Sequence, residues 1–234
     1  MDRRSFLESC SAGAACVSAA VALPGWAAEA KQKDYAPALL VDERGDPLRA
    51  SELKAQSNYV FHYPFEATPV FLLDLGRPVP AHSLSTQEQG AYNWPGGVGR
   101  NHSIVAFSAI CAHQLVYPTR EVSFISFRKT RAQRGVQDGL IHCCAENSQY
   151  DPAKGAEVLS GPAKQPLCAV LLTHDPKSDT LTAHATLGPE LFDAFFQKYE
   201  MKLSFDVGPK AKNSVRGHTT VSALEKFCKN PIQC

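Results

Sequence analysis

Two short segments of this chain carry side chains that bind soft and borderline metal ions. The first contains Cys111 and His113, and the second, further along the chain, contains Cys143, Cys144 and Glu146. Thiolate sulfur and imidazole nitrogen are the ligands expected of zinc, copper or an iron–sulfur centre. Paired ligand segments commonly close a single site, so the two segments together predict a metal centre.

The residues around these ligands resemble those of the Rieske proteins. That family holds a [2Fe-2S] cluster with Cys-x-His in one loop and Cys-x-x-His in a second. The second motif continues as Gly-Ser-x-Tyr/Phe-Asp, and a Gly-Pro loop then shields the cluster. The resemblance extends over residues 90–190. The matching residues are Cys111 and His113, then Ser148, Tyr150 and Asp151, and finally Gly161 and Pro162.

The resemblance also implies roles for individual residues and departs from the family at one ligand. Counting back from Ser148 makes Cys143 the second cysteine ligand and puts Glu146 in the place of the second histidine. Ser148 and Tyr150 match the hydroxyl donors to the cluster sulfurs, while Gly161 and Pro162 match the cover. The family's optional disulfide is missing, because its two positions hold Val116 and Ala145, and Asn147 stands at a glycine position.

Several ligand sets remain open at this point. A cluster can carry Glu146 or water at the fourth position, or it can use both Cys143 and Cys144 with His113. The second set needs a strongly bent loop, since adjacent residues of an extended segment point apart. His142 is a further substitute for the missing imidazole, although a surface or hydrogen-bonded role is the commoner one for such a histidine. The third possibility is a fold that has lost its cluster.

The overall pattern predicts an all-β domain with a helical C-terminal extension. Runs of β-branched and aromatic residues alternate with turn residues, which is typical of stacked antiparallel sheets or a barrel. Residues 78–99, rich in Gly, Pro, Ser and Asn, are expected to form a surface loop. Apolar residues at helical spacing predict a helix over 190–202 and a second one over 221–227. The expected divisions are N-terminal strands (31–80), a cluster-binding domain (81–189) and a helical tail (190–234).

The first 30 residues are expected to be a twin-arginine signal peptide. Arg3 and Arg4 precede a small and apolar stretch, and Ala28-Glu29-Ala30 offers a cleavage site. This route exports folded proteins, which suits a cluster inserted before export, and it predicts a periplasmic protein. The apolar stretch is short for a bilayer-spanning helix, which needs about 20 residues, so membrane association is expected only if the leader is retained.

The sequence also predicts the state of the remaining cysteines and the role of the charged residues. Cys168 lies in an apolar run and is expected to be a buried free thiol, while Cys228 and Cys234 are expected to pair. The formal net charge of +1 gives no reason to expect nucleic acid binding. Arg128, Lys129, Arg131 and Arg134 predict a solvated hairpin tip or, alternatively, a docking patch for an acidic partner. Trp94 is expected to anchor its loop or to shield the site.

The resemblance implies an electron-transfer subunit rather than a stand-alone enzyme. Imidazole ligands raise the potential of such clusters to about −150 to +300 mV. The implied partners are a donor enzyme or quinol and a cytochrome, or a larger oxidoreductase subunit. The alternative is a scaffold subunit without a cluster, or one holding zinc through Cys111, His113, Cys143 and Cys144, because three thiolates and one imidazole suit tetrahedral zinc.

Overall fold

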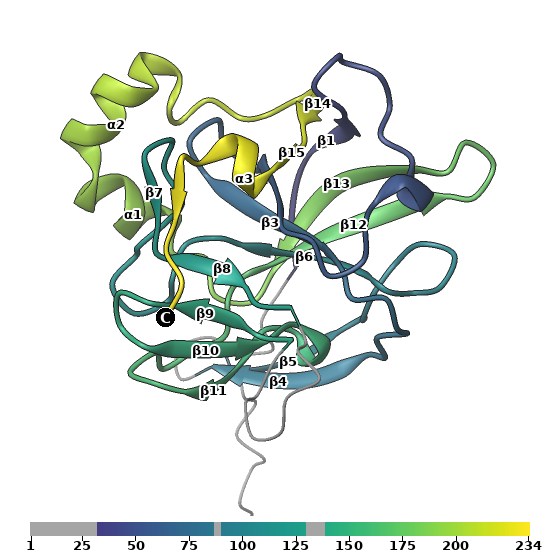
Figure 1. The fold of residues 1–234 in the computed structure, drawn as a ribbon, viewed down its shortest axis with the longest axis horizontal. Helices are drawn as coiled ribbons and strands as arrows, with labels where there is room; N and C mark the ends of the chain where they lie inside the picture. The colour runs from purple at the N-terminus through teal and green to yellow at the C-terminus, as the bar shows by residue number, and fades with distance from the viewer. Residues whose placement is uncertain (1–31, 87–89, 130–138) are drawn as a thin grey trace, which may run out of the picture.

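The computed structural model describes residues 32–86, 90–129 and 139–234, and β-strands dominate it (Figure 1). The expected all-β class with helices near the C-terminus is confirmed. The expected leader lies outside the described residues. The strands are β1 (Lys33–Val41), β2 (Tyr59–His62), β3 (Pro69–Asp74), β4 (His82–Thr86), β5 (Gly90–Trp94), β6 (Ile104–Ser108), β7 (Val122–Ser123), β8 (Ile125–Phe127), β9 (Ile141–Cys143), β10 (Ser148–Asp151), β11 (Glu157–Ser160), β12 (Ala169–Asp175), β13 (Thr180–Leu187), β14 (Gly217–Thr220), β15 (Ser222–Ala223) and β16 (Asn230–Pro231). The α-helices are α1 (Phe192–Lys198), α2 (Glu200–Asp206) and α3 (Leu224–Phe227).

The largest sheet has the strand order β14-β1-β13-β12-β6-β3-β2-β15 and curls until its edges meet. Its two edge strands, β14 and β15, are separated by Val221 alone. The edges are also joined directly, since the Thr219 hydroxyl of β14 donates to the His62 carbonyl of β2 at 3.0 Å. The result is a nearly closed barrel, which leaves few free strand edges.

The central strands of this sheet are buried on both faces. Along β3 and β6, alternate residues enter two different cores, because successive side chains of a strand point to opposite sides. Leu72 and Ala106 lie in one core, with residues contributed from around the barrel. Phe71 and Phe107 lie in the second core, which the smaller sheets cover from outside.

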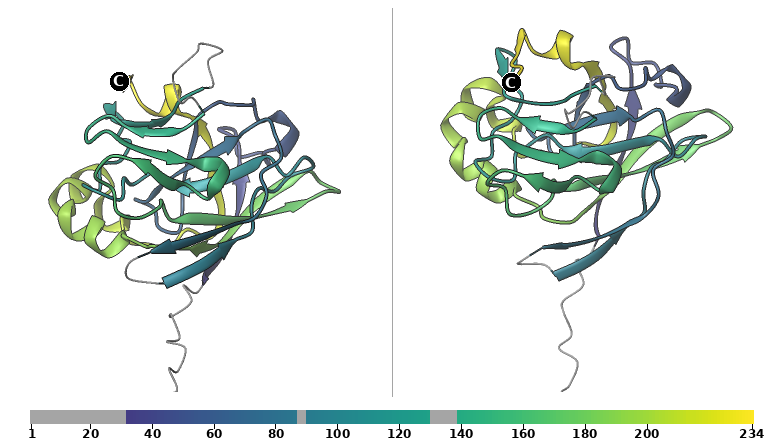
Figure 2. Two further views of the ribbon diagram at one scale, coloured as in Figure 1. Left: turned by 90° about the horizontal axis from the view of Figure 1, so that it is seen from below. Right: turned by 60° about the horizontal axis from the view of Figure 1, so that its bottom comes forward.

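A four-stranded antiparallel sheet, in the order β11-β10-β9-β8, packs against that outer core. Ile125, Ile141 and Tyr150 are fully buried and supply its inner face. Seen from below, this small sheet lies in front of the large one, and the α1–α2 pair lies at one end of it (Figure 2). The two segments singled out in the sequence belong to this layer and to its junction with β6.

The expected surface loop at 78–99 contains the hairpin of β4 and β5 instead. Its burial alternates along both strands, with Leu84, Tyr92 and Trp94 buried in the outer core. The residues between them face outward. Many of these are of types common in turns, so the period-two pattern is hard to recognise in the sequence. The prediction of a loop, which relied on composition alone, was therefore wrong for β4 and β5. The alternation of buried and exposed residues indicates a pair of strands there.

The C-terminal tail, residues 190–234, is only partly helical. A break at Tyr199 divides the expected helix over 190–202 into α1 and α2. The tail also supplies β14 and β15 to the large sheet, and β16 pairs with β7 in parallel. In the part of the chain that the structure describes, no helix is long and apolar enough to cross a membrane.

Candidate metal centre

The first ligand segment is a tight loop that leaves the end of β6. The backbone amide of Cys111 donates to the carbonyl of Val116 at 2.8 Å, and the amide of Leu115 donates back to Cys111 at 3.0 Å. Leu115 has a φ of 59°, a conformation that bulky residues rarely adopt. The loop buries the Cys111 side chain completely and leaves His113 partly exposed.

The second ligand segment is the turn of the β9–β10 hairpin. Cys143 and Ser148 are paired at the base of the turn, and the amide of Glu146 donates to the Cys143 carbonyl at 3.3 Å. Asn147 closes the turn with a φ of 56°. Asparagine tolerates this left-handed conformation better than most residues, so it can stand where glycine is usual.

The two segments bring the thiols of Cys111 and Cys143 into hydrogen-bonding contact. Both side chains are 0% exposed. Their contact lowers the pKa of Cys111 to about 6, and the hydrogen bond from Tyr150 lowers it further while burial opposes ionisation. The same contact, together with burial, raises the pKa of Cys143. The two shifts are opposite in direction because one proton can bridge the two sulfurs, and a metal ion bound by both would displace it.

The Tyr150 hydroxyl connects with the first loop at two points. It accepts a hydrogen bond from the amide of Ala112 at 3.1 Å and lies 3.3 Å from the sulfur of Cys111. Burial raises the pKa of Tyr150, so the phenol keeps its proton. Because its oxygen already accepts from Ala112, this proton is placed to reach the Cys111 sulfur, the role that the sequence resemblance implied for Tyr150.

His113 and Glu146 form a second pair of potential ligands. In the sequence, His113 follows Cys111 closely and Glu146 follows Cys143 closely. Nδ1 of His113 lies 3.5 Å from Oε2 of Glu146. This nitrogen is buried and has no hydrogen-bond partner among the residues that the structure describes, although the ring is partly exposed. Buried polar atoms are normally satisfied, so an unsatisfied imidazole nitrogen beside a carboxylate is a sign of a ligand atom.

The cover loop packs directly onto the hairpin turn. Gly161 has a φ of 91°, and a Cβ there would lie 2.5 Å from both the carbonyl oxygen of Asn147 and the Cα of Ser148. Only glycine fits this approach. Next to the exposed Pro162, the amide of Ala163 donates to the Ser148 hydroxyl oxygen at 3.3 Å, which holds that buried side chain in place.

Cys144 is bonded to Cys234 in a disulfide, and this corrects two expectations. The sets that use Cys144 as an alternative or additional ligand, including the four-residue zinc site, are wrong because its sulfur is already bonded. The expected pairing of Cys228 with Cys234 is also wrong, because Cys228 is a buried free thiol, as Cys168 is. His142 is the neighbour of Cys143 within β9, so its side chain leaves the opposite face of the strand.

The donors are therefore arranged as two pairs rather than as one group. Among residues 32–86, 90–129 and 139–234, no three His, Cys, Asp or Glu side chains are placed to hold a single metal ion. A zinc site of the structural kind needs four converging donors. A two-iron cluster with one thiolate pair and one pair of nitrogen or oxygen donors agrees with the arrangement found here, apart from the carboxylate in place of one imidazole.

The C-terminal tail holds both loops of the site. The Lys198 ammonium of α1 donates to the Gln114 carbonyl at 2.5 Å, and Phe195 packs edge-on against Tyr117 with ring centroids 4.9 Å apart. At the other loop, the disulfide ties Cys144 to the chain end. The tail thus restrains both segments that carry the candidate ligands.

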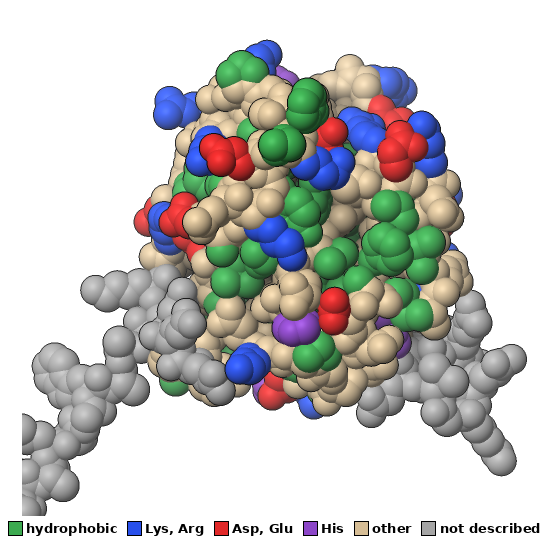
Figure 3. Space-filling model, turned by 90° about the vertical axis from the view of Figure 1, so that its left-hand side faces the viewer, with side chains coloured by type: hydrophobic (Ala, Val, Ile, Leu, Met, Phe, Trp, Pro, Cys, Tyr) green, Lys and Arg blue, Asp and Glu red, His purple; other side chains and the backbone are tan. Residues whose placement is uncertain are grey.

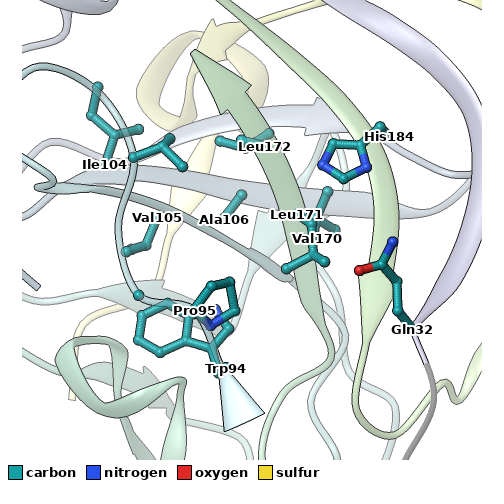
Figure 4. Close-up of a pocket in the computed structure, with 12 residues that line it drawn as sticks. Gln32, Trp94, Pro95, Ile104, Val105, Ala106, Val170, Leu171, Leu172 and His184 are labelled. Atoms are coloured by element: carbon teal, nitrogen blue, oxygen red, sulfur yellow. The ribbon is translucent and has the colours of Figure 1, made fainter. Parts of the chain in front are cut away.

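Trp94 and Arg128, two other residues singled out in the sequence, contact other parts of the fold. Trp94 is buried, packs against Phe107 with ring centroids 5.5 Å apart and lines a cavity of about 250 Å³ between β5, β6 and β12 (Figure 4). Of the positive cluster, Arg128 donates to the Ile232 carbonyl at 3.2 Å, next to the disulfide. Arg131 and Arg134 lie outside the described residues.

No protein-family model matches the sequence. Among solved structures, the chain is similar to the soluble domain of Rieske protein II from Sulfolobus acidocaldarius, with a TM-score of 0.46 and 24% sequence identity. The match covers 65% of this chain and 78% of that one. A likeness this low carries no conclusion about the present chain, so its function has to be argued from its own side chains.

Proposed function

We propose that this chain is an electron-transfer protein that binds a [2Fe-2S] cluster through Cys111, Cys143 and His113. One observation carries the proposal: two thiols from separate loops meet in the core, and the Tyr150 phenol is directed at one of them. A structural cysteine pair needs no such hydroxyl. Hydrogen bonds to cluster sulfurs, by contrast, are a recognised means of setting a reduction potential.

When bound, the cluster would accept and release one electron at a time, and each part of the site has a task in that chemistry. Cys111 and Cys143 would hold one iron where solvent is excluded, and Tyr150 would favour the reduced state by donating to the Cys111 sulfur. The Gly161 loop closes over the hairpin turn and keeps water out. His113 and Glu146 are partly exposed, so an electron would enter or leave the cluster on their side of the site.

The cellular setting is part of the proposal. Arg3 and Arg4 support export by the twin-arginine route to the periplasm, where the partner would be a cytochrome or a larger oxidoreductase subunit. The face that carries α1 and α2 shows hydrophobic side chains among charged ones (Figure 3), and Met201 and Phe205 of α2 are strongly exposed, which supports a protein partner. Replacing Arg3 and Arg4 with lysine should keep the protein in the cytoplasm, and unimpaired export of that variant would contradict this route.

The decisive experiment is anaerobic purification of the mature chain, followed by iron and sulfide analysis and visible and electron paramagnetic resonance spectra. We expect a coloured protein with about two irons per chain. Cys143→Ser should remove the iron, whereas Cys168→Ser, which alters a buried thiol outside the site, should retain it. Equal iron content in both variants would overturn the proposal.

A scaffold protein without a cluster is the second candidate, favoured by the carboxylate that occupies the place of an imidazole. In that case the contact between Cys111 and Cys143 would allow the two thiols to form a disulfide after export, passing two electrons and two protons to a disulfide-carrying thiol oxidase of the periplasm. Mass spectrometry of colourless protein with those two residues linked would support this candidate and exclude the first.

A further inference from the structure

We infer that Glu146 is the fourth ligand of the cluster, so that one iron is held by an imidazole and a carboxylate. The inference rests on the proposed function and goes beyond it, because it replaces the two-imidazole iron with a mixed pair. The distance between the two donor atoms is its first support. Two ligands at about 2.1 Å from a tetrahedral metal ion stand about 3.4 Å apart. Nδ1 of His113 and Oε2 of Glu146 are separated by 3.5 Å.

The surroundings of the two atoms give a second, independent support. Within the described part of the chain, the buried Nδ1 of His113 has no hydrogen-bond partner, and the Glu146 carboxylate makes no ion pair except the one with His113. The pair His174–Asp179 closes to a hydrogen bond at 2.9 Å. The pair His82–Glu157 is as open, at 3.7 Å, but its imidazole nitrogen is not a buried atom without a partner, as Nδ1 of His113 is. The wider spacing at His113 leaves the facing lone pairs available to a metal ion.

The backbone explains why Glu146 reaches this position. The hydrogen bond from its amide to Cys143 and the left-handed Asn147 turn the hairpin so that residue 146 faces the first loop. Gly161 presses on the same turn and prevents it from opening. The carboxylate is thus held by the hairpin that also presents Cys143, which is the arrangement required of a ligand.

A carboxylate ligand has a chemical consequence that an imidazole does not. An anionic oxygen in place of a neutral nitrogen makes the cluster more negative by one charge, which disfavours reduction. The inference therefore predicts that Glu146→His raises the reduction potential. We expect the reduction equilibrium to change at least tenfold, which is about 59 mV for one electron.

The test compares Glu146→His and Glu146→Gln with a matched control, Glu157→Gln. Glu157 also lies beside a histidine, with 3.7 Å between its carboxylate and His82, but far from any thiol in the sequence. We expect Glu146→His to keep its iron, to raise the potential and to show two nitrogen couplings in pulsed paramagnetic resonance where the natural protein shows one. Glu146→Gln should retain several-fold less iron, and Glu157→Gln should behave as the natural protein does.

The outcomes separate this inference from the proposed function. If the natural protein holds two irons while Glu146→Gln leaves iron content, spectrum and potential unchanged, Glu146 is not a ligand and the inference fails alone. If neither the natural protein nor Glu146→His holds iron while circular dichroism shows both folded, the proposed function fails and the inference fails with it. A single nitrogen coupling in Glu146→His that is unchanged from the natural protein would also overturn the inference.

Discussion

The hydroxyl oxygen of Tyr150 lies 3.3 Å from the sulfur of Cys111, although the two residues are 39 positions apart. The same oxygen accepts from the amide of Ala112 at 3.1 Å. One side chain of the small sheet therefore fixes both a thiol and the backbone of the first loop. Its removal should affect the chemistry of the site and the stability of the fold in separable ways.

Tyr150→Phe should lower the reduction potential of the bound cluster while leaving it in place. A hydrogen bond to the thiolate worth about 1 kcal/mol corresponds to about 40 mV for one electron. The unfolding free energy should also fall by about 0.5–1.5 kcal/mol, because the partly buried amide of Ala112 loses its acceptor. Tyr92→Phe is the matched control, since its buried hydroxyl has no hydrogen-bond partner within the described residues. Protein-film voltammetry should find the potential of Tyr92→Phe unchanged, and an equal shift in both variants would refute the assignment.

The residues that meet at the site were predictable from the sequence because they depend on short spacings. Cys111 with His113, and Cys143 with Glu146, each lie in one turn, so local geometry alone brings them to a common loop. The contacts across the site, between Cys111 and Cys143 and between His113 and Glu146, then follow if the two loops meet. The Asn147 turn, with its positive φ, shows why the motif tolerates a residue other than glycine.

The tail was harder to predict because its structure depends on contacts distant in sequence. The pairing of Cys144 with Cys234 spans 90 residues, and no local pattern marks it. The nearby Cys228 offered a shorter loop, but its side chain is buried beside α3 and is not available. Strands β14 and β15 are equally hidden in the sequence, because they are short and exist only where the edges of the barrel meet.

The disulfide between Cys144 and Cys234 should be present in the purified protein and should stabilise its fold. Peptide mapping of non-reduced protein should find Cys144 linked to Cys234 and Cys228 unlinked. Replacing both linked residues with serine should lower the unfolding free energy by about 2–4 kcal/mol, since the cross-link restrains the unfolded chain. A reductant should lower the melting temperature of the natural protein and leave that of the double variant unchanged. A linked peptide joining Cys228 to Cys234 would contradict the structure.

His62 should make stability depend on pH. Burial, and then the charge of Arg120, lower its pKa to about 4, whereas the unfolded chain titrates near pH 6.5. Between these values the unfolded state binds more protons, so stability is complete above pH 6.5 and falls as the pH drops toward 4. The loss at this residue amounts to at most about 3 kcal/mol.

His62→Gln should reduce the stability difference between pH 7.5 and pH 4.5, measured by urea denaturation. The exposed His218→Gln should keep the natural difference. Acidic residues contribute equally in all three proteins, so the comparison isolates His62. An unchanged difference in His62→Gln would mean that the ring is protonated as easily in the folded protein as in the unfolded one.

Gly161→Ala tests the contact that closes the site. The added methyl group would meet the carbonyl oxygen of Asn147 and the Cα of Ser148 at 2.5 Å, and both atoms belong to backbone that cannot move without opening the turn. The left-handed conformation costs about 1–2 kcal/mol for any residue with a Cβ, and the clash adds about 1–3 kcal/mol. We therefore expect a loss of roughly 2–5 kcal/mol in unfolding free energy.

Gly208→Ala separates the two contributions, because Gly208 has a φ of 73° and no atom within 4 Å of the added group. It should lose only the conformational part, about 1–2 kcal/mol, and keep the iron content of the natural protein. Gly161→Ala should also release iron faster, because a displaced cover loop admits water to the hairpin turn that carries Cys143. Chemical denaturation and the rate of iron loss to a chelator measure the two effects. Equal stability losses in the two variants would show that the cover loop moves to accommodate the methyl group. Glycine would then be needed at position 161 only for its positive φ.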